Sequence, residues 1–226
     1  MKITYFGHSA FALQDGSQGI LIDPFLSGNS HFRGKSLPKD LTISTIIATH
    51  GHGDHIGDAV ALSLKHRAPI VAVAELAGLL AAKGCSTIAC GVGGKIEHSW
   101  GWSRFVPACH SSDFEGKYAG NAVGVVCNIG GITVYHAGDT CLFGDMKLIG
   151  EMYKPDVALL PIGSCFTMDI YEATKAAEFL GAKTVIPMHY NTFPAVKADP
   201  EEYRLAVEGQ GLARVEIMPV LGSLEF

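Results

Sequence analysis

The segment spanning residues 49–55 holds four side chains that can bind a metal ion within six positions: His50, His52, Asp54 and His55. The first two histidines leave a strand on the same side, because side chains alternate along a strand. Gly51 and Gly53 are expected to let the chain turn tightly, so that the carboxylate and the third histidine return to the same point. Imidazole nitrogens and carboxylate oxygens suit zinc and the neighbouring transition metals. The segment therefore predicts a metal site and not merely a histidine-rich turn.

Further candidate ligands follow apolar stretches elsewhere in the chain, each where a predicted strand ends. They are His110 after residues 102–108, Asp139 after 132–135, and His189 after 184–188. His50 likewise follows the apolar run 43–48. Ligand sites of sheet-based folds gather at strand ends, so these residues can converge if two sheets stack. A single histidine after a strand is usually structural, whereas this combination predicts two adjacent metal sites.

Two more residues lie near predicted strand ends and have two interpretations each. Asp23, before Pro24, either hydrogen-bonds a ligand imidazole and fixes its tautomer or simply forms a turn. His8, between Gly7 and Ser9, is either a proton donor or substrate contact in the site or a hydrogen-bonded structural histidine. The sequence leaves both alternatives open.

The other histidines and the cations give weaker signals. His136 lies inside a strand pattern and is expected to be structural, and three others are expected at the surface: His31, His66 and His98. The densest cationic group, Arg33, Lys35 and Lys39, lies in a loop over residues 24–40 that is longer than most structureless loops. This loop is a candidate specificity segment. Its cations could meet an anionic substrate, although solvated side chains are the simpler explanation.

Length and composition restrict the class of protein. The 226 residues suffice for a large core, and 1–226 is expected to form a single domain. Hydrophobic residues make up 48% and charged residues 17%, which is typical of a compact globular chain. The formal net charge of −5 weighs against a dedicated nucleic-acid-binding protein, although a local basic patch is compatible with it.

Cysteine usage and hydropathy predict the location. The six cysteines contain no Cys-x-x-Cys pair and are expected to be small buried residues of a reducing compartment. Residues 1–6 alternate like a strand and have no long apolar core of a secretory signal. Residues 118–138 lack Asp, Glu, Lys and Arg, but asparagine, histidine and repeated glycines interrupt them. We expect a cytoplasmic protein without a membrane span, and the sequence leaves a homo-oligomer open.

Short strands, turns and helices alternate along the chain without a linker or a repeat. The expected strands are 3–6, 10–13, 19–22, 43–48, 70–73, 86–89, 96–99, 102–108, 122–127, 132–135, 157–160, 184–187 and 215–218. The expected helices are 58–66, 75–83, 145–152, 169–180 and 200–208, and a hairpin turn is expected at 128–131. This mixture predicts an α+β fold in which two sheets pack together with helices outside.

The motif His-x-His-x-Asp-His after an apolar strand resembles the signature of the metallo-β-lactamase superfamily. Segments 7–10, 22–24, 166–168 and 187–191 look like those of its small single-domain metal-dependent hydrolases, which are related to the ascorbate-6-phosphate lactonases. The resemblance spans nearly the whole chain. It implies a four-layer αββα sandwich, with two mixed β-sheets packed face to face and helices outside.

The resemblance also implies which residues bind which ion. It gives one set of ligands for a first metal ion: His50, His52 and His110. It gives a second set for a second ion, with Asp139 bridging the two: Asp54, His55 and His189. The zinc lactamases that hydrolyse penicillins carry a cysteine where this chain has Asp139, so a β-lactam is not the expected substrate. The flavodiiron branch carries an acidic residue where this chain has His52, and the nuclease branches carry a large inserted domain that is absent here.

These ligands predict a metal-dependent hydrolase with two divalent cations, zinc first and manganese, iron or nickel as alternatives. Two cations about 3.5–4 Å apart lower the pKa of a shared water from about 16 to about 7, and the resulting metal-bound hydroxide attacks a carbonyl carbon or a phosphorus. The expected reaction is cleavage of an ester, lactone or phosphodiester bond in a small anionic substrate. Asp54 is the expected catalytic residue that orients the nucleophile, with His8 as the candidate proton donor.

Three other functions stay open on the same residues. A nuclease would use the ions on RNA or DNA, with binding that depends steeply on salt. An iron-binding oxidoreductase would use the cage for oxygen chemistry, and a metal or ligand sensor would use it only for structure. Metal analysis, an oxygen-uptake assay and a screen of lactones, phosphodiesters and nucleic acids would separate these functions.

Overall fold

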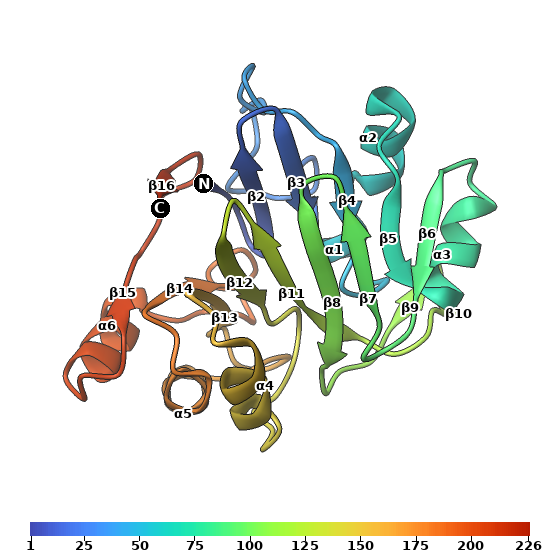
Figure 1. Ribbon diagram of the computed structural model, residues 1–226. Helices are drawn as coiled ribbons and strands as arrows, with labels where there is room; N and C mark the ends of the chain where they lie inside the picture. The colour runs from blue at the N-terminus through green and yellow to red at the C-terminus, as the bar shows by residue number, and fades with distance from the viewer.

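The computed structural model describes residues 1–226 and contains two seven-stranded sheets (Figure 1). The first sheet runs, from edge to edge, through β16 (Ser223–Glu225), β1 (Lys2–Gly7), β2 (Ala10–Asp15), β3 (Gln18–Ile22), β4 (Thr45–Ile47), β5 (Ile70–Val73) and β6 (Thr87–Cys90). The second runs through β15 (Arg214–Val215), β14 (Thr184–Met188), β13 (Val157–Pro161), β12 (Ile132–His136), β11 (Val123–Ile129), β8 (Gly101–Pro107) and β7 (Lys95–His98).

Both sheets are mixed, as predicted. In the first sheet β1, β2 and β3 are antiparallel neighbours, whereas β3 to β6 run parallel. In the second sheet β12 to β15 run parallel, whereas β11, β8 and β7 are antiparallel. Parallel strands that are covered on both faces read as continuous apolar runs. Accordingly, β5 and β13 are buried at every position.

Six helices accompany the sheets: α1 (Gly53–Ile56), α2 (Ala59–His66), α3 (Ala74–Ala81), α4 (Met146–Tyr153), α5 (Ile170–Leu180) and α6 (Pro200–Glu208). Helix α3 packs on β5 and β6 of the first sheet, and α5 packs on β13 of the second. Figure 1 shows α2 and α3 beside the first sheet and α4 to α6 beside the second. The four-layer αββα arrangement is therefore confirmed. None of the helices combines the length and the apolar character that crossing a bilayer requires.

Local signals explain why the last two helices were predicted closely. The Asp169 side chain accepts a hydrogen bond from Glu172 N at 2.8 Å, which completes a capping box at the start of α5. Gly181 ends that helix in the left-handed conformation. Before α6, Asp199 accepts from Glu201 N at 2.9 Å. Each cap satisfies backbone groups that the helix leaves unpaired.

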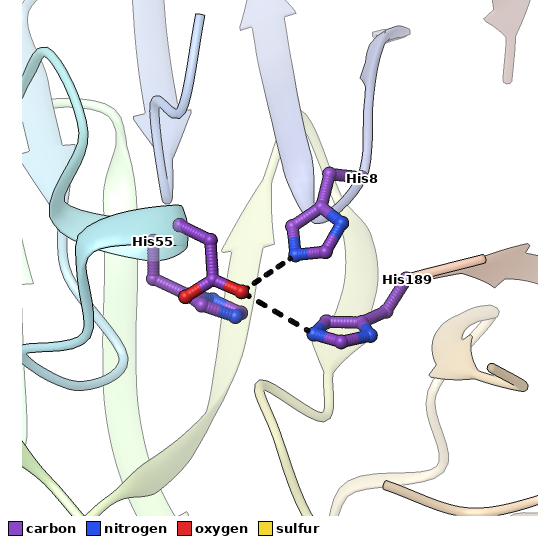
Figure 2. A group of neighbouring side chains, drawn as sticks. His8, His55 and His189 are labelled. Carbon is purple, nitrogen blue, oxygen red and sulfur yellow. Dashed lines mark hydrogen bonds and ion pairs between the residues drawn. The ribbon is translucent and has the colours of Figure 1, made fainter. Parts of the chain in front are cut away.

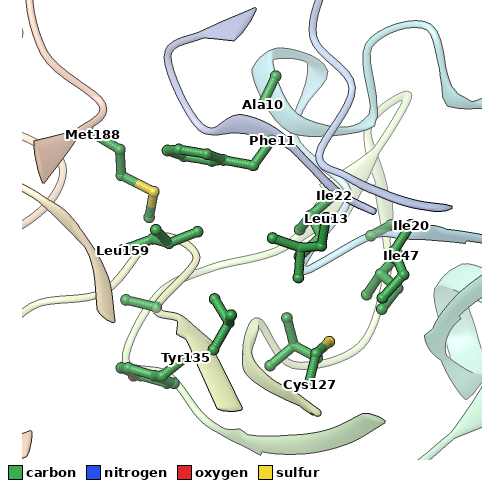
Figure 3. Close-up of a cluster of buried hydrophobic side chains, with 14 of the residues drawn as sticks. Ala10, Phe11, Leu13, Ile20, Ile22, Ile47, Cys127, Tyr135, Leu159 and Met188 are labelled. Atoms are coloured by element: carbon green, nitrogen blue, oxygen red, sulfur yellow. The ribbon is translucent and has the colours of Figure 1, made fainter. Parts of the chain in front are cut away.

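The hydrophobic core lies between the two sheets and forms one cluster of 61 buried residues. Figure 3 shows Phe11, Leu13 and Ile22 of the first sheet facing Tyr135 and Leu159 of the second. Removal of this apolar surface from water is the main force that holds the sheets together. Because the strands are fixed by the core, the loops at their ends have defined positions.

Several predicted elements differ from the structure. The strand expected at 43–48 is limited to Thr45–Ile47, and the one at 215–218 is limited to Arg214–Val215. The sequence missed the two-residue strands β9 (Asp113–Phe114) and β10 (Lys117–Tyr118), which lack an apolar alternation. It also missed β16, which is defined by pairing with β1 from the other end of the chain. The partner of β16 is distant, and local patterns do not contain it; β9 and β10 pair with each other but are only two residues long.

The cysteine prediction is only partly correct. All six cysteines are free, so a disulfide framework is absent, as expected. Cys85 and Cys127 are buried, but three are exposed: Cys109, Cys141 and Cys165. The expectation that cysteines occupy the interior is wrong for these three, because each lies in a loop that follows a strand and not in the core.

Candidate metal centre

The candidate ligands come from four separate segments of the chain and from both sheets. The end of β4 and the single helical turn α1 supply four of them: His50, His52, Asp54 and His55. Three more follow β8, β12 and β14, in that order: His110, Asp139 and His189. The structure therefore brings all seven predicted residues together at one edge of the sandwich.

One group consists of three imidazoles. The ligand atoms of His50, His52 and His110 all lie within 4.8 Å of one another. His50 Nε2 faces His52 Nδ1 at 3.1 Å. His50 is buried, whereas the other two rings are half-buried, so this group is accessible from one side. Asp113, which was not predicted, lies with its carboxylate 3.4 Å from His52 Nε2.

The second group adds His8 to the three predicted residues Asp54, His55 and His189, again with ligand atoms within 4.8 Å. Figure 2 shows His8, His55 and His189 pointing toward one another from three different elements. Asp54 Oδ2 lies 3.1 Å from His8 Nε2 and 3.8 Å from His189 Nε2. Its side chain is 29% exposed and is the most accessible of the four.

The Asp139 carboxylate lies between the two groups. Its Oδ1 is 3.1 Å from His55 Nε2, and its Oδ2 is 3.1 Å from His189 Nε2. The same Oδ2 is 3.6 Å from His110 Nε2 and 4.0 Å from His50 Nε2. One buried carboxylate thus faces nitrogens of both sets of ligands that the sequence implied.

Asp23 and Thr49 fix the tautomers of two imidazoles. Asp23 Oδ2 accepts from His55 Nδ1 at 2.7 Å and from Thr49 Oγ1 at 2.6 Å, and Oδ1 accepts from Thr49 N at 2.8 Å. Because the Thr49 hydroxyl donates to Asp23, it accepts from His50 Nδ1, 3.0 Å away. Both histidines therefore carry the proton on Nδ1, and their Nε2 lone pairs face the centre. Of the two interpretations of Asp23, the structure supports the hydrogen bond to an imidazole.

Buried polar atoms without partners mark where cations fit. His55 Nε2, Asp139 Oδ1 and both ring nitrogens of His189 are buried and make no hydrogen bond. Leaving a buried polar group unpaired costs free energy. Bound cations would pair with each of these atoms except one of the two ring nitrogens of His189. Nitrogen and carboxylate donors in this arrangement suit zinc and its neighbours.

The charges of the protein groups favour a cation. Burial alone would raise the pKa of Asp139, but the His55 and His189 imidazoles hold it well below its usual range. Burial alone would lower the pKa of His55, but the Asp139 and Asp23 carboxylates raise it well above its usual range. These carboxylates therefore attract positive charge at His55 Nε2, where a metal ion would compete with a proton.

His8 lies in the second group and is not a remote structural residue. Its Nε2 is 3.1 Å from Asp54 Oδ2, and its Nδ1 is 3.0 Å from Thr192 Oγ1. Burial lowers the pKa of His8 to about 4, although the hydrogen bond to Asp54 opposes this. The ring is therefore neutral near pH 7. The Thr192 hydroxyl, which donates to Tyr190 O at 3.3 Å, contacts the side of the His8 ring opposite Asp54.

Three residues of the centre have left-handed backbone conformations without being glycine. They are Asp23 (φ 45°), His189 (φ 54°) and His8 (φ 58°). The His189 amide donates to His8 O at 2.9 Å, which ties two of these segments together. Such conformations cost about 1–3 kcal/mol each and persist where the surrounding structure requires them, most often at functional sites.

The remaining histidines do not join the centre. His136 donates from Nε2 to Ser9 O at 2.9 Å and accepts at Nδ1 from Gly138 N at 3.0 Å, so its predicted structural role is confirmed. His66 is exposed, as predicted. His31 and His98 are partly exposed, and His98 stacks on Trp100.

The cationic loop residues lie apart from the histidines. Arg33 and Lys35 are exposed and line a hollow together with Leu26 and Lys65. No histidine of the centre lines this hollow. The side chains that sequence reasoning missed are those whose partners are remote, such as Thr192 beside His8. Thr49, by contrast, stands directly before the metal-binding motif and could have been noticed there.

Known proteins resemble this chain over its full length. The profile of the beta-lactamase superfamily domain matches residues 2–189. A UPF0173 metal-dependent hydrolase of Archaeoglobus fulgidus is 45% identical over 100% of this chain and 99% of that protein. One from Geobacillus thermodenitrificans is 46% identical over 90% of this chain and 91% of that protein.

A solved structure gives the same result. Igni18, a metallo hydrolase of the archaeon Ignicoccus hospitalis, superposes with a TM-score of 0.91 at 40% identity, covering 100% of this chain and 98% of that one. Sequence, fold and the group of histidines agree. The chain therefore belongs to the beta-lactamase superfamily, within its UPF0173 group of metal-dependent hydrolases.

Proposed function

We propose that this hydrolase cleaves an ester, lactone or phosphodiester bond at a centre of two divalent cations, with zinc as the first choice and manganese, iron or nickel as alternatives. The observation that carries the proposal is the position of Asp139, whose Oδ2 is 3.1 Å from His189 Nε2 and 3.6 Å from His110 Nε2. In the proposal, His50, His52 and His110 would hold one ion, Asp54, His55 and His189 would hold the other, and Asp139 would bind both.

Two bridged cations, when bound, would lower the pKa of a shared water and polarise the bond to be cleaved. Asp54 is partly exposed, so its carboxylate can orient the attacking water while it binds an ion. His8 Nε2 lies 3.1 Å from Asp54 Oδ2, and in the proposal the His8 ring orients this carboxylate, which takes a proton from the attacking water and passes it to the leaving oxygen of the substrate. Thr192 Oγ1, 3.0 Å from His8 Nδ1, holds the other side of the ring.

The rim of the second group supports a small anionic substrate with an apolar part. Phe193 is 38% exposed, with its ring centre 5.4 Å from that of His8 and 6.1 Å from that of Phe25. Lys197 lines a hollow together with Phe193 and Thr192. An apolar substituent would pack on the phenylalanine ring, and the ammonium group would attract a negative charge.

Metal analysis and a substrate screen test the proposal. The purified protein should hold about two metal ions per chain and should hydrolyse members of a panel of lactones, esters and phosphodiesters. Replacement of His52 or Asp139 with Ala should remove activity and metal loading while the protein stays folded by circular dichroism. His66→Ala, on the exposed face of α2, is the matched control and should retain both.

The same experiment separates the competing functions. A fully active protein without metal would end the proposal. Iron loading with oxygen uptake would point to an oxidoreductase, and salt-dependent binding of oligonucleotides with cleavage would point to a nuclease. Metal loading without an exchangeable water or any turnover would point to a sensor. The cytoplasmic location and a homo-oligomeric state stay predictions, for cell fractionation and size-exclusion chromatography to check.

A further inference from the structure

Two exposed cysteines flank the candidate metal centre. Cys109 directly precedes His110, and Cys141 follows Asp139 by two residues. The two segments belong to different strand ends, after β8 and after β12. Neither thiol has a role in the hydrolysis proposed above, and neither belongs to the groups of candidate ligands.

The two cysteines lie side by side across these segments. Cys141 N donates to Cys109 O at 3.3 Å. This bond holds the two loop backbones against each other, and disulfides join residues whose Cα atoms lie close together, about 4.4–6.8 Å apart. Thr140 reinforces the contact, because its hydroxyl accepts from Cys109 N at 3.0 Å and donates to Cys141 O at 2.7 Å.

The side chains of the pair also interact. The Cys141 thiol lies within hydrogen-bonding reach of the Cys109 thiol. The other cysteines offer no such pair: Cys127 is enclosed in the core, and Cys165 is exposed in the loop after β13. Cys165 is therefore a natural internal reference for a single accessible thiol.

We propose that Cys109 and Cys141 form a redox-active dithiol, which closes reversibly to a disulfide and cross-links the segments that carry His110 and Asp139. The oxidant is a low-molecular-weight disulfide of the glutathione class. One thiolate attacks it to give a mixed disulfide and one released thiol. The second cysteine then attacks the protein-bound sulfur, and the second small thiol leaves. Two electrons pass from the protein to the oxidant, and the two protons leave with the small thiols.

Closure would tie two of the candidate ligand segments together in the arrangement that they already have. Because the segments are already joined by backbone contacts, the cross-link should keep the centre intact and oppose its opening. The metal should therefore leave the oxidised protein to a chelator several-fold more slowly than it leaves the reduced protein. This consequence rests on the proposed ligand roles, whereas formation of the disulfide does not.

Mass spectrometry of the metal-loaded protein, treated with oxidised glutathione, tests the proposal. Apart from the mass of any glutathione adduct, the wild type should lose two hydrogen atoms in mass, and trypsin should release residues 105–117 cross-linked to residues 118–147. Cys165 should carry only a glutathione adduct. Dithiothreitol should restore the original mass. Because the readout is mass, a negative result here is distinguishable from a failure of the proposed hydrolysis.

Single-cysteine variants keep the proposal falsifiable. Cys109→Ser and Cys141→Ser should each leave the remaining cysteine with a glutathione adduct and without the cross-linked peptides. Cys165→Ser should still form the cross-link. Separate adducts on Cys109 and Cys141 in the wild type, or no reaction beyond that of Cys165, would overturn the proposal. Release of metal at equal rates before and after cross-linking would overturn its consequence for the centre.

Discussion

At the scale of single residues, Asp23 shows how a side chain that does not face the substrate can decide what the centre binds. It is fully buried, and it accepts hydrogen bonds from His55 Nδ1 and from the backbone and hydroxyl of Thr49. Burial alone would raise the pKa of Asp23, but the charge and hydrogen bond of His55 lower it. Its carboxylate is thereby kept ionised, and two imidazoles are held with their Nε2 atoms toward the centre.

Asp23→Asn should therefore weaken metal binding, although the two side chains are nearly the same size. The NH2 group of the amide would face N–H or O–H groups that now donate to Asp23. The hydrogen bonds that orient His55 and, through Thr49, His50 would then be lost. Removal of such partners costs about 10–100-fold in metal affinity, and we expect a loss of about 1–3 kcal/mol in the free energy of unfolding. Chelator competition and urea unfolding measure the two effects.

Asp58→Asn is the matched control for this variant. Asp58 Oδ2 accepts from Leu26 N and Ser27 N in the adjoining loop at 2.9 and 2.8 Å, and it contacts no histidine. The control should lose stability while metal affinity stays within about twofold, because only the loop contact is weakened. Equal losses of metal affinity in both variants would contradict the role given to Asp23.

The burial of the His8 ring predicts that the stability of the fold depends on pH. Its pKa is lowered to about 4 by burial in the folded chain, against about 6.5 in the unfolded chain. Between these values the unfolded chain binds one more proton, so stability rises with pH there and is lost as pH falls from 6.5 toward 4. The loss in the free energy of unfolding reaches about 3 kcal/mol at pH 4 and levels off below it.

His8→Gln in chelator-treated protein measures that contribution. The difference in free energy of unfolding between pH 7 and pH 4 should be smaller in the variant than in the wild type by about 3 kcal/mol. Any constant cost of the left-handed backbone at this position cancels in the comparison of the two pH values. Identical pH profiles would show that His8 is protonated in the folded protein as readily as in the unfolded chain.

At the scale of elements, the turn from β4 into α1 depends on one of its two glycines. Neither Gly51 nor Gly53 has a positive φ, so the tight turn predicted there does not depend on a left-handed backbone at either glycine. A Cβ on Gly51 would lie 2.6 Å from Asp113 O and 3.0 Å from the Ala119 Cβ, whereas a Cβ on Gly53 would meet nothing within 4 Å. The β9–β10 hairpin thus lies directly on the metal-binding turn, which requires glycine only where the backbones touch.

Gly51→Ala and Gly53→Ala should consequently have opposite effects. The first should displace the turn or the hairpin, with a loss of about 1–3 kcal/mol in stability and weaker metal binding. The second adds a helix-favouring residue in open space at the start of α1 and should be neutral or stabilising by up to about 1 kcal/mol. Thermal unfolding and metal titration of the pair check this. Equal effects would mean that the hairpin does not restrict the turn.

The difference between local and remote partners explains which elements the sequence could predict. Helices with their own caps, such as α5 and α6, and strands buried along their length, such as β5 and β13, carry the information within the segment. The edge strands β15 and β16 exist because a partner from elsewhere in the chain is present, whereas β9 and β10 pair with each other and are too short to show an alternation. Candidate ligands were predictable because their chemistry is rare at strand ends. Thr192 and Asp113 were not, because only the fold brings them to His8 and His52.

At the scale of the whole molecule, the centre connects two sheets that otherwise meet through the apolar core. The first sheet leads to His50, His52, Asp54 and His55, and the second leads to His110, Asp139 and His189. Bound cations would therefore join segments from both halves of the chain. The unfolded chain has no such arrangement, so binding energy adds to the stability of the folded state.

Metal removal should accordingly lower the melting temperature of the entire fold and not only of one loop. At a free metal concentration about 1,000 times the dissociation constant, binding adds about 4 kcal/mol. For a chain of this size each kcal/mol corresponds to about 2–4 °C, so chelation should lower the melting temperature by on the order of 10 °C in one cooperative transition. Calorimetry with chelator, followed by return of the metal, measures the shift. The melting temperature of Asp139→Ala should not respond to chelator, because this variant lacks the carboxylate between the two groups of ligands. His66→Ala keeps that carboxylate and should show the full response. A wild-type melting temperature that chelator does not change would mean that the two sheets are not joined through metal.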